Sequence, residues 1–486
     1  MQIETEKASI ERPMPIRSIS TKLIFLCLEA QRYHYLRTFA KNSFTMKKYL
    51  LILIALLLAS GTFAQKKEIV KKGWNFGPLP VVGYDADLGF QYGVCCDIFN
   101  YGDGSRYPRY DYKFNVEASR YTKGSGVFRF YSDMPYVIKD TKLFFDVTYF
   151  YAKKYEFFGF NGYEASAFDP NMGFIPDSIT SSYHFINRNQ FRFVGSMQRP
   201  FFNVPNLHWS AGLAYYNTSI SPIDTVKLTT LAGQKPTLYE NYVKEGIIHA
   251  DEANGGNTLQ FRLGMIYDSR DHNSDPTKGI YAEATLVGAP DIIDREGYSN
   301  LSFTFIWRQY IPVYKDKLTL AYRLGTQNRI AGKTPWYMIN NLNTMFFQKM
   351  YTEGLGGAVT MRGVNRNGVM GEGYAFGNLE LRWRIVGFQF INQNWQVALA
   401  PFFDAGMVTQ KFREKEMKAA DGHNDYLAGS DYYSGQKESV HTSAGCGLKL
   451  IMNRNMILAV DLGRALNERD RDAKKFKTFI GFNYIF

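Results

Sequence analysis

The sequence predicts an all-β fold, a transmembrane antiparallel β-barrel of about sixteen strands. Three observations predict it: segments that alternate between apolar and polar residues, a composition rich in aromatic residues and glycine, and a strand-like carboxyl-terminal segment that ends in phenylalanine. Alternation of this kind places apolar side chains against lipid and polar side chains around a wet lumen. A soluble sheet would bury its apolar face under another layer, and the sequence shows no helical layer that could cover it.

The alternation is clearest in residues 378–385. One face carries Leu379, Leu381, Trp383 and Ile385, and the other carries Asn378, Glu380, Arg382 and Arg384. The same two-residue period recurs in residues 112–117, 142–149, 259–268, 301–308 and 317–324. A shift of one residue would move a whole apolar row into the lumen. The pattern therefore predicts which side chains face the interior.

The composition fits a barrel better than a helical membrane protein. The chain has 486 residues, of which 16% are aromatic and 42 are glycine, yet its mean hydropathy is only −0.28. Aromatic residues suit the interfacial girdles of a barrel, and glycine suits its turns and curved strands. A soluble β-sandwich also has many strands, but single sandwiches are usually much shorter. The net charge of +12 is explained in part by lumenal arginines and needs no nucleic-acid partner.

Residues 46–64 have the pattern of a secretory signal peptide. Met46-Lys47-Lys48 precedes an apolar run, and small residues precede Gln65. The apolar run is shorter than the roughly 20 residues that span a bilayer as a helix. We interpret residues 1–45 as a non-native or disordered leader, with a genuine cytoplasmic leader as the alternative.

The exported chain is predicted to be one barrel. Residues 65–78 form a short periplasmic segment and residues 79–486 the barrel, since the stretch before the first predicted strand is far below the usual domain minimum of about 50 residues. Short turns, expected on the periplasmic side, lie near residues 123–124, 203–205, 315–316 and 453–454. Long polar connections, expected outside the cell, lie near residues 153–187, 219–256, 329–370 and 406–437.

The sequence predicts no cofactor, no metal site and no catalytic site. The cysteines after the signal are Cys95, Cys96 and Cys446, and neighbouring strand residues such as the first two point to opposite faces. The histidines after the signal are His184, His208, His249, His272, His423 and His441. None of them belongs to a recognisable Ser-His or Asp-His pattern, and no G-x-S-x-G motif is present.

Three segments together resemble the superfamily of BamA/TamA-type barrels, also called the bacterial surface antigen family. The first is Thr360-Met361-Arg362-Gly363-Val364, similar to the arginine-glycine tip of the family's long sixth extracellular loop, although Met361 and Val364 depart from the usual pattern. The second is Phe402-Phe403-Asp404-Ala405-Gly406, similar to the family's Phe-x-Asp-x-Gly. The third is a mid-barrel hairpin that carries Asp268, Arg270, Asp271 and Gly279.

The resemblance implies that the Arg362 loop folds back into the barrel and pairs with Glu380 and Asp404. The alternation independently assigns both acids to the lumen. A guanidinium offers a rigid fork of donors that suits carboxylates, and Gly363 permits a backbone turn that other residues resist. The alternative is that Arg362 lies on a mobile external loop and that the acids line a wet pore.

The last residues of the chain are expected to form the final strand. Ile480, Phe482, Tyr484 and Phe486 would share one face. This arrangement resembles the carboxyl-terminal signal by which outer-membrane barrels are recognised for assembly.

The functional expectation is a barrel of the bacterial outer membrane that inserts or translocates proteins or lipids without covalent catalysis. Its partners would be outer-membrane lipid, client polypeptides and a separate periplasmic protein. The alternative is a passive channel with a basic lumen, which would favour anions. A barrel hydrolase is the remote alternative. The basic residues that favour the passive channel are Arg262, Arg308, Arg323, Arg382 and Arg384.

Overall fold

The computed structural model divides the chain into two compact units, residues 1–65 and 66–486, and the second is described. The described residues are 69–85, 88–165, 183–223, 236–293, 297–342, 354–421, 432–470, 473, 475–482 and 484–486. The predicted leader and signal peptide lie outside them. Within these residues, no helix is long and apolar enough to cross a membrane.

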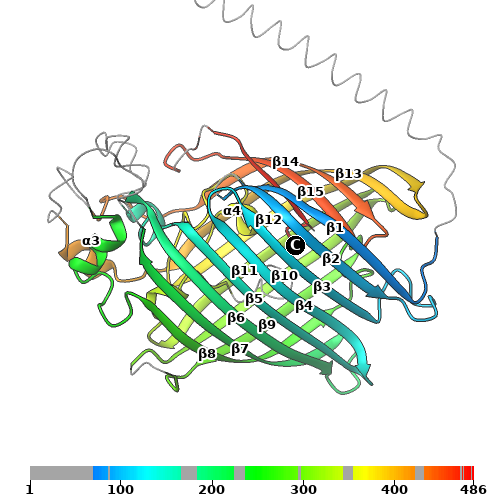
Figure 1. Ribbon diagram of the computed structural model, residues 1–486, viewed down its shortest axis with the longest axis horizontal. Coiled ribbons are helices and arrows are strands. Elements are labelled where there is room, and N and C mark those ends of the chain that lie inside the picture. Colours follow the sequence, from blue (N-terminus) through cyan, green and yellow to red (C-terminus); the bar gives the residue numbers. More distant parts are fainter. Residues whose placement is uncertain are drawn as a thin grey trace, which may run out of the picture. The chain divides into compact units, whose positions relative to one another are not determined.

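Sixteen antiparallel strands form a closed barrel in which every strand pairs with its neighbours in sequence and β1 pairs with β16 (Figure 1). This confirms the predicted fold class. The strands are β1 (Trp74–Asp85), β2 (Gly89–Asn100), β3 (Tyr112–Tyr121), β4 (Ser125–Ile138), β5 (Thr141–Glu156), β6 (Phe185–Pro200), β7 (Leu207–Pro222), β8 (Gly255–Asp268), β9 (Gly279–Ala289), β10 (Asn300–Tyr314), β11 (Leu318–Gly332), β12 (Gly373–Phe390), β13 (Gln393–Gln410), β14 (His441–Met452), β15 (Met456–Ala465) and β16 (Lys477–Phe482). Short helices lie in the connections: η2 (Gly162–Glu164), α3 (Leu238–Lys244), η5 (Trp336–Met338), α4 (Gly357–Thr360) and α5 (Glu414–Ala419).

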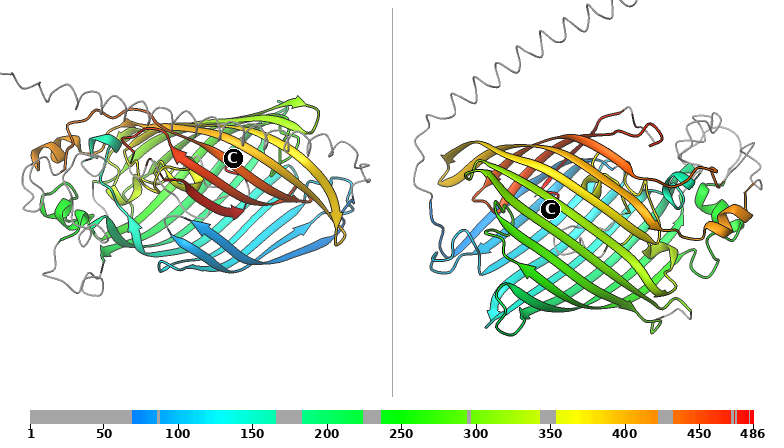
Figure 2. Two further views of the ribbon diagram at one scale, coloured as in Figure 1. Left: turned by 90° about the horizontal axis from the view of Figure 1, so that it is seen from above. Right: turned by 180° about the vertical axis from the view of Figure 1, so that it is seen from behind.

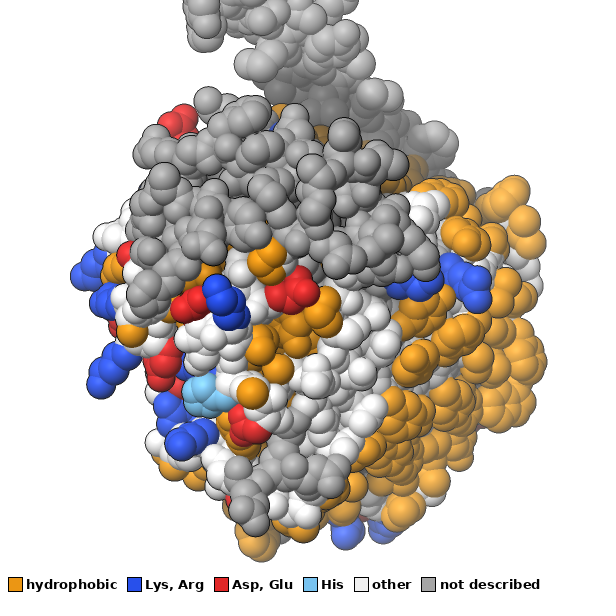
Figure 3. All heavy atoms as spheres, turned by 60° about the vertical axis from the view of Figure 1, so that its left-hand side comes forward, with side chains coloured by type: hydrophobic (Ala, Val, Ile, Leu, Met, Phe, Trp, Pro, Cys, Tyr) orange, Lys and Arg blue, Asp and Glu red, His pale blue; other side chains and the backbone are white. Residues whose placement is uncertain are grey.

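The two faces of the strands follow the predicted alternation. On β12, Leu379 is 44% exposed and Leu381 is 38% exposed, whereas Glu380 between them is fully buried in the lumen. Figure 3 shows hydrophobic side chains gathered over the barrel wall. Apolar side chains on a wall of this kind suit contact with lipid acyl chains.

The connections differ in length between the two ends of the barrel. The long ones follow β5, β7, β11 and β13 and therefore share one end, here called the outer end; the turns after β6, β10 and β14 lie at the opposite end, here called the inner end. One prediction is wrong. The turn at Lys123-Gly124 follows an odd-numbered strand and lies at the outer end, because strand direction, and not turn length, decides the side.

Aromatic residues from the long connections form a cluster at the outer end. Phe157 contacts Tyr242 and Trp336, with ring centroids 5.4 and 5.6 Å apart. Phe160 packs edge-on against Phe412 at 4.8 Å. Thr237 precedes α3 and caps its N-terminus in a capping box. The connections after β5, β7, β11 and β13 thus share one buried core, here called the outer aromatic cluster.

The barrel begins at Trp74, five residues before the predicted boundary. The start of β1 was not predicted because this strand contains Pro78 and Pro80. The backbone groups of Gly73 bond to residues that flank β2. Backbone hydrogen-bonding groups alternate in direction along a strand. Those of the even-numbered residues of β1, which include both prolines, therefore point away from β2. Proline is tolerated in a strand where its missing N–H faces no partner. The ladder from β1 to β2 consequently runs without interruption from Trp74 to Asp85.

The seam between β1 and β16 is short: among the described residues, its partners are Tyr84↔Ile480 and Asp85↔Phe479 (Figure 2). If this register continued, Pro80 would lie opposite residue 484 and Pro78 opposite residue 486, and neither proline could donate a hydrogen bond. The chain leaves the strand after Phe482. The prediction that Tyr484 and Phe486 extend the face of the last strand is therefore wrong: both side chains are buried, 3% and 8% exposed.

We predict that Pro78→Val with Pro80→Val lengthens the seam, because it restores two donors, each worth about 1 kcal/mol in a hydrogen bond. A cysteine pair at Val82 and Phe482 should form a disulfide more completely in this background than in the parent. A pair at Tyr84 and Ile480 should form equally in both backgrounds and is the control. Equal oxidation at 82 and 482 in the two backgrounds would show that the prolines do not end the seam.

Candidate functional site

The connection from β11 to β12 enters the lumen and is held there by apolar packing. Leu355, Met361, Val364 and Val369 of this connection are buried, each at most 1% exposed. They pack with lumenal side chains of the wall, among them Tyr374, Phe376 and Val408. This hydrophobic contact places the segment around α4 against the inside of β12 and β13. Arg362 follows directly after it.

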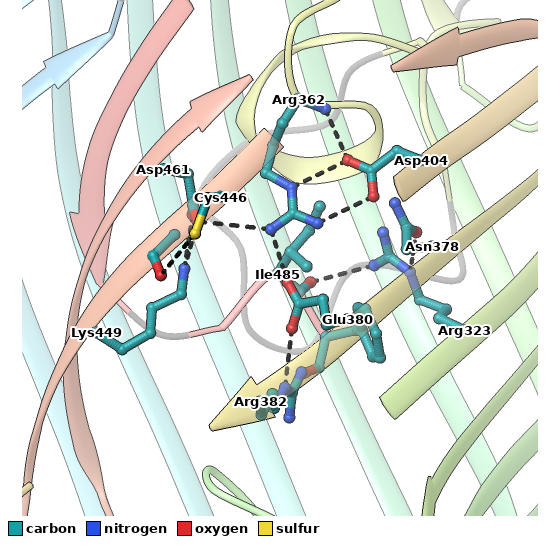
Figure 4. Close-up of polar contacts among 12 residues, drawn as sticks. Arg323, Arg362, Asn378, Glu380, Arg382, Asp404, Cys446, Lys449, Asp461 and Ile485 are labelled. Atoms are coloured by element: carbon teal, nitrogen blue, oxygen red, sulfur yellow. Dashed lines mark hydrogen bonds and ion pairs between the residues drawn. The ribbon is translucent and has the colours of Figure 1, made fainter. Parts of the chain in front are cut away.

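Arg362 is fully buried and bound by two carboxylates (Figure 4). Its Nε and Nη2 each donate to Asp404 of β13 at 3.0 Å, one to each carboxylate oxygen. Its Nη1 donates to Glu380 of β12 at 2.7 Å, and its backbone N–H donates to Asp404 at 3.1 Å. The structure thus brings together the three residues that the resemblance singled out. The forked geometry is the strongest form of arginine–carboxylate contact.

An aromatic ring supports the guanidinium. The Cζ atom of Arg362 lies 3.5 Å from the ring centroid of Phe402. The ring fits because two neighbouring positions are glycine: a Cβ at Gly445 would lie 2.5 Å from the Phe402 ring, and one at Gly463 would lie 3.1 Å from it. Sequence reasoning quoted Phe402 only as part of a motif and missed both glycines. Their role depends on contacts between β13, β14 and β15, which no local pattern encodes.

Two other glycines permit the close approach of the loop to the wall. Gly363 has φ +99, and a Cβ there would lie 2.6 Å from the backbone nitrogen of Arg464 on β15. A Cβ at Gly406 would lie 2.8 Å from the sulfur of Met361. Side chains at these positions would push the loop away from β13 and β15. We call Arg362, Gly363, Glu380, Phe402 and Asp404 the anchoring site.

Further charges continue the network around the anchoring site. Asp461 lies 3.6 Å from Nη1 of Arg362 and accepts from Lys449 at 2.7 Å. Glu380 also accepts from Arg382 at 2.8 Å. Buried charges are costly unless each is paired and hydrogen-bonded. Three carboxylates here face three cations, so the group is electrically balanced.

The network also reaches β1 and the residues that follow β16. Arg366, four residues after Arg362, donates to Asp85 at the end of β1 at 2.6 Å. Arg382 donates to the backbone oxygen of Phe486 at 2.7 Å, and its Cζ lies 3.8 Å from the ring centroid of Tyr484. Sequence reasoning missed Arg366 and Asp85, which lie 281 residues apart and share no motif. The only sequence feature that could have drawn attention to Arg366 was its position four residues after Arg362.

The mid-barrel hairpin at the inner end is a second polar group, and it is half-buried. Arg270 forms two hydrogen bonds with Asp268, at 2.9 and 2.8 Å. Asp271 caps the turn by accepting from the backbone and hydroxyl of Thr277. Gly279 has φ +104, and a Cβ there would lie 2.3 Å from a backbone oxygen. The predicted hairpin residues therefore hold the turn in shape.

The hairpin contacts distant turns at the inner end. Asp275 accepts from Arg384 of β12 at 2.7 Å. Its backbone oxygen accepts from Arg454, in the turn after β14, at 2.9 Å. Because β8 and β9 lie on the wall opposite β16 and β1 in the strand order, residues 269–278 extend across the lumen. The inner end of the described barrel is thus partly covered from within.

One histidine contact was not foreseen. His441 lies 2.5 Å from Asp470 and stacks on Tyr163 at 3.8 Å. The contact joins the start of β14 to the connections after β5 and β15. His441 and Asp470 are 0% and 3% exposed, so the pair offers no surface to a substrate. Among the described residues, no group of three or more histidine, cysteine or acidic side chains is placed to hold a metal ion.

The fold and the anchoring site define a class: sixteen-stranded membrane barrels whose sixth outer connection is fixed in the lumen by an arginine. The sequence model of the Omp85 superfamily domain matches residues 112–484. The chain therefore belongs to the Omp85 superfamily, and it is a protein of the bacterial outer membrane. Comparison with curated proteins found no matching sequence.

Two solved structures are similar to this chain. BamA from Haemophilus ducreyi lacking POTRA domains 1–3 is 17% identical, with a TM-score of 0.47, over 85% of this chain and 71% of that chain. CdiB from Escherichia coli is 10% identical, with a TM-score of 0.49, over 87% of this chain and 64% of that chain. The chain thus spans about two thirds of the length of these proteins.

We predict that Arg362→Ala, Glu380→Ala and Asp404→Ala each lower barrel stability. Removing one member of a buried ion pair costs about 3–5 kcal/mol, and double substitutions should cost less than the sum, since these residues form one network. The temperature at which the barrel loses its folded mobility on gels measures this. Arg106→Ala is the control, because that side chain is 47% exposed beside Asp111 and should cost less than about 1 kcal/mol. Strict additivity would contradict the network.

We also predict acid sensitivity of the hairpin through His272. Burial, followed by the charge of Arg454, lowers the pKa of His272 to about 4, below its unfolded value of about 6.5. The unfolded state therefore binds the proton more readily, so the stabilisation is complete above about pH 6.5 and is lost as the pH falls toward 4, by roughly 3 kcal/mol. His272→Gln should flatten the dependence of the unfolding temperature on pH in that window, relative to the parent. Equal profiles for variant and parent would refute the assignment.

Proposed function

We propose that this barrel inserts or translocates polypeptides at the outer membrane without covalent catalysis. The seam between β1 and β16 carries this proposal. Among the described residues, every other pair of neighbouring strands has six or more partner positions, whereas this pair has two. In lipid, strand edges need partners because no water satisfies their backbone groups. A seam held by two pairs is the least costly place for the wall to open, and an exposed strand edge pairs readily with another chain.

A cavity lies on the lumenal side of the seam. Its volume is about 180 Å³, and its lining includes Tyr84 and Asp85 of β1, Phe479 and Gly481 of β16, and Ile485 beyond β16. Opening of the seam would therefore connect the membrane plane with a preformed space. This arrangement supports lateral passage of a client segment.

The anchoring site is proposed to control the seam. The same connection that carries Arg362 holds β1 through Arg366 and Asp85. Arg323 of β11 donates to the backbone oxygens of Ile485 and Val359, at 3.2 and 3.0 Å. Movement of the connection would therefore release contacts on both sides of the seam together.

A passive anion channel is the second candidate, because lumenal arginines such as Arg262, Arg308 and Arg323 favour anions. The described lumen holds the Arg362 connection, the hairpin at residues 269–278 and the carboxyl-terminal residues, which favours the first proposal. Single-channel conductance with anion preference that Arg362→Ala does not change would favour the channel.

Client polypeptides and a separate periplasmic protein are the proposed partners, with outer-membrane lipid around the wall. The segment before β1 is held at the inner end, where Ile69 exchanges hydrogen bonds with Asn394 and Lys71 donates to the backbone of Asn392. Lys72 beside it is exposed. Crosslinking in cells from residues 66–72 would capture a protein that binds here.

We predict that a disulfide between cysteines at Tyr84 and Ile480 abolishes insertion, because it prevents the seam from opening. The measurement is the rate at which an unfolded eight-stranded barrel protein, diluted from urea, becomes protease-protected in vesicles that contain the purified protein. Reduction should restore the rate. A disulfide between Leu213 and Phe261, partners on β7 and β8, is the control and should leave the rate unchanged. An unaltered rate in the oxidised seam variant would rule out lateral opening.

A further inference from the structure

The lumenal wall near the outer end holds a buried guanidinium that lacks an acceptor. Arg188 of β6 is 1% exposed, and neither its Nη1 nor its Nη2 has a hydrogen-bond partner among the residues that the structure describes. Its strand partners are Ala152 and Ile220, both members of the outer aromatic cluster. An unpaired buried charge is strongly destabilising. Such a group in a native protein calls for an unseen partner.

One of the two carboxylates of the neighbouring strand β5, that of Asp146, is already engaged. Asp146 accepts from Arg129 at 2.7 Å and from Arg192 at 2.6 Å. Arg262 of β8 donates to Tyr216 and Gln260. None of these hydrogen bonds involves Arg188.

Two asparagine side chains gather with Arg188 around one tyrosine. The Cζ atom of Arg188 lies 4.9 Å from the ring centroid of Tyr155. The hydroxyl of Tyr155 accepts from Nδ2 of Asn340 at 2.6 Å and donates to Oδ1 of Asn367 at 3.1 Å. Asn367 belongs to the connection that carries Arg362, and Asn340 follows η5 in the same connection.

The orientation of both amides follows from the network. The backbone N–H of Gly354 donates to Oδ1 of Asn367 at 3.3 Å, which identifies this atom as the acceptor. Tyr155 has one proton, so it donates to Asn367 and accepts from Asn340. One donor, Nδ2 of Asn367, and one acceptor, Oδ1 of Asn340, then remain without a partner among the described residues.

We propose that Arg188, Asn367 and Asn340 form a binding site for a phosphate-type oxyanion. The fork of two open Nη atoms matches two oxygens of a tetrahedral oxyanion, and Nδ2 of Asn367 supplies a third donor. Oδ1 of Asn340 accepts a hydrogen bond and therefore suits a protonated oxygen. Hydrogen phosphate or a monoester phosphate has such an oxygen, whereas sulfate has none at neutral pH.

The same chemistry has two sources, free inorganic phosphate and the monoester phosphate of a lipid headgroup such as that of phosphatidic acid. The test uses the purified full barrel in detergent and follows its unfolding temperature at constant ionic strength. Inorganic phosphate, sulfate and glycerol 3-phosphate, the soluble headgroup compound of phosphatidic acid, are titrated separately. A ligand that binds only the folded barrel raises this temperature in a saturable way.

Arg188→Met removes the charge and keeps much of the side-chain volume, and it should abolish the response. Arg129→Met is the matched control: it removes another buried lumenal arginine, should lower the starting temperature, and should keep the response. Asn367→Asp places a carboxylate beside Arg188, so it should raise stability without ligand and remove the response.

The outcomes separate the sources. Saturation by inorganic phosphate at concentrations where sulfate has little effect, lost in Arg188→Met, supports a free-ion site. Saturation by the headgroup compound alone, also lost in Arg188→Met, supports a lipid-derived phosphate. The proposal is overturned if no ligand gives a saturable response, if Arg188→Met responds like the parent, or if Arg188→Met is more stable than the parent in every buffer, which would indicate an arginine solvated only by water.

Discussion

The buried contact between Arg362 and the carboxylates of Glu380 and Asp404 is the interaction on which the interior of this barrel depends. A guanidinium with two acids at hydrogen-bond distance, all three shielded from water, is stable only while every member stays in place. Because Arg362 comes from a connection and the acids come from β12 and β13, the contact fixes the path of that connection through the lumen. The positions of Arg366 and Asn367 follow from that path.

Much of the fold could be predicted from the sequence because lipid and lumen impose a strict period of two. Leu379 and Glu380 illustrate it: adjacent residues face opposite environments, and the pattern persists around the barrel. The long connections were predictable for the same reason, since they interrupt the alternation. The side of the Lys123-Gly124 turn was not, because it depends on the number of strands before it, and β1 was hidden by its prolines.

The anchoring site was predictable only in part. Arg362 and Asp404 stand in short motifs whose members lie near one another in sequence, and the alternation assigns Glu380 to the lumen. Gly445 and Gly463 act through the ring of Phe402, and Asp85 acts through Arg366 across almost the whole chain. Such contacts arise from closure of the barrel, which brings the first strand beside the last. The inward turn of Tyr484 and Phe486 has the same origin, because it depends on which residues of β1 lie opposite them.

The outer aromatic cluster affects the route by which a polypeptide could leave the barrel. Rings from four separate connections interlock above the strands, so an axial route to the cell surface would require disassembly of a hydrophobic core made of segments hundreds of residues apart. Sideways departure between the first and last strands breaks the two backbone pairings described for the seam and leaves that core intact. Under the proposed function, a client would therefore pass into the plane of the bilayer, and surface exposure would come only after release.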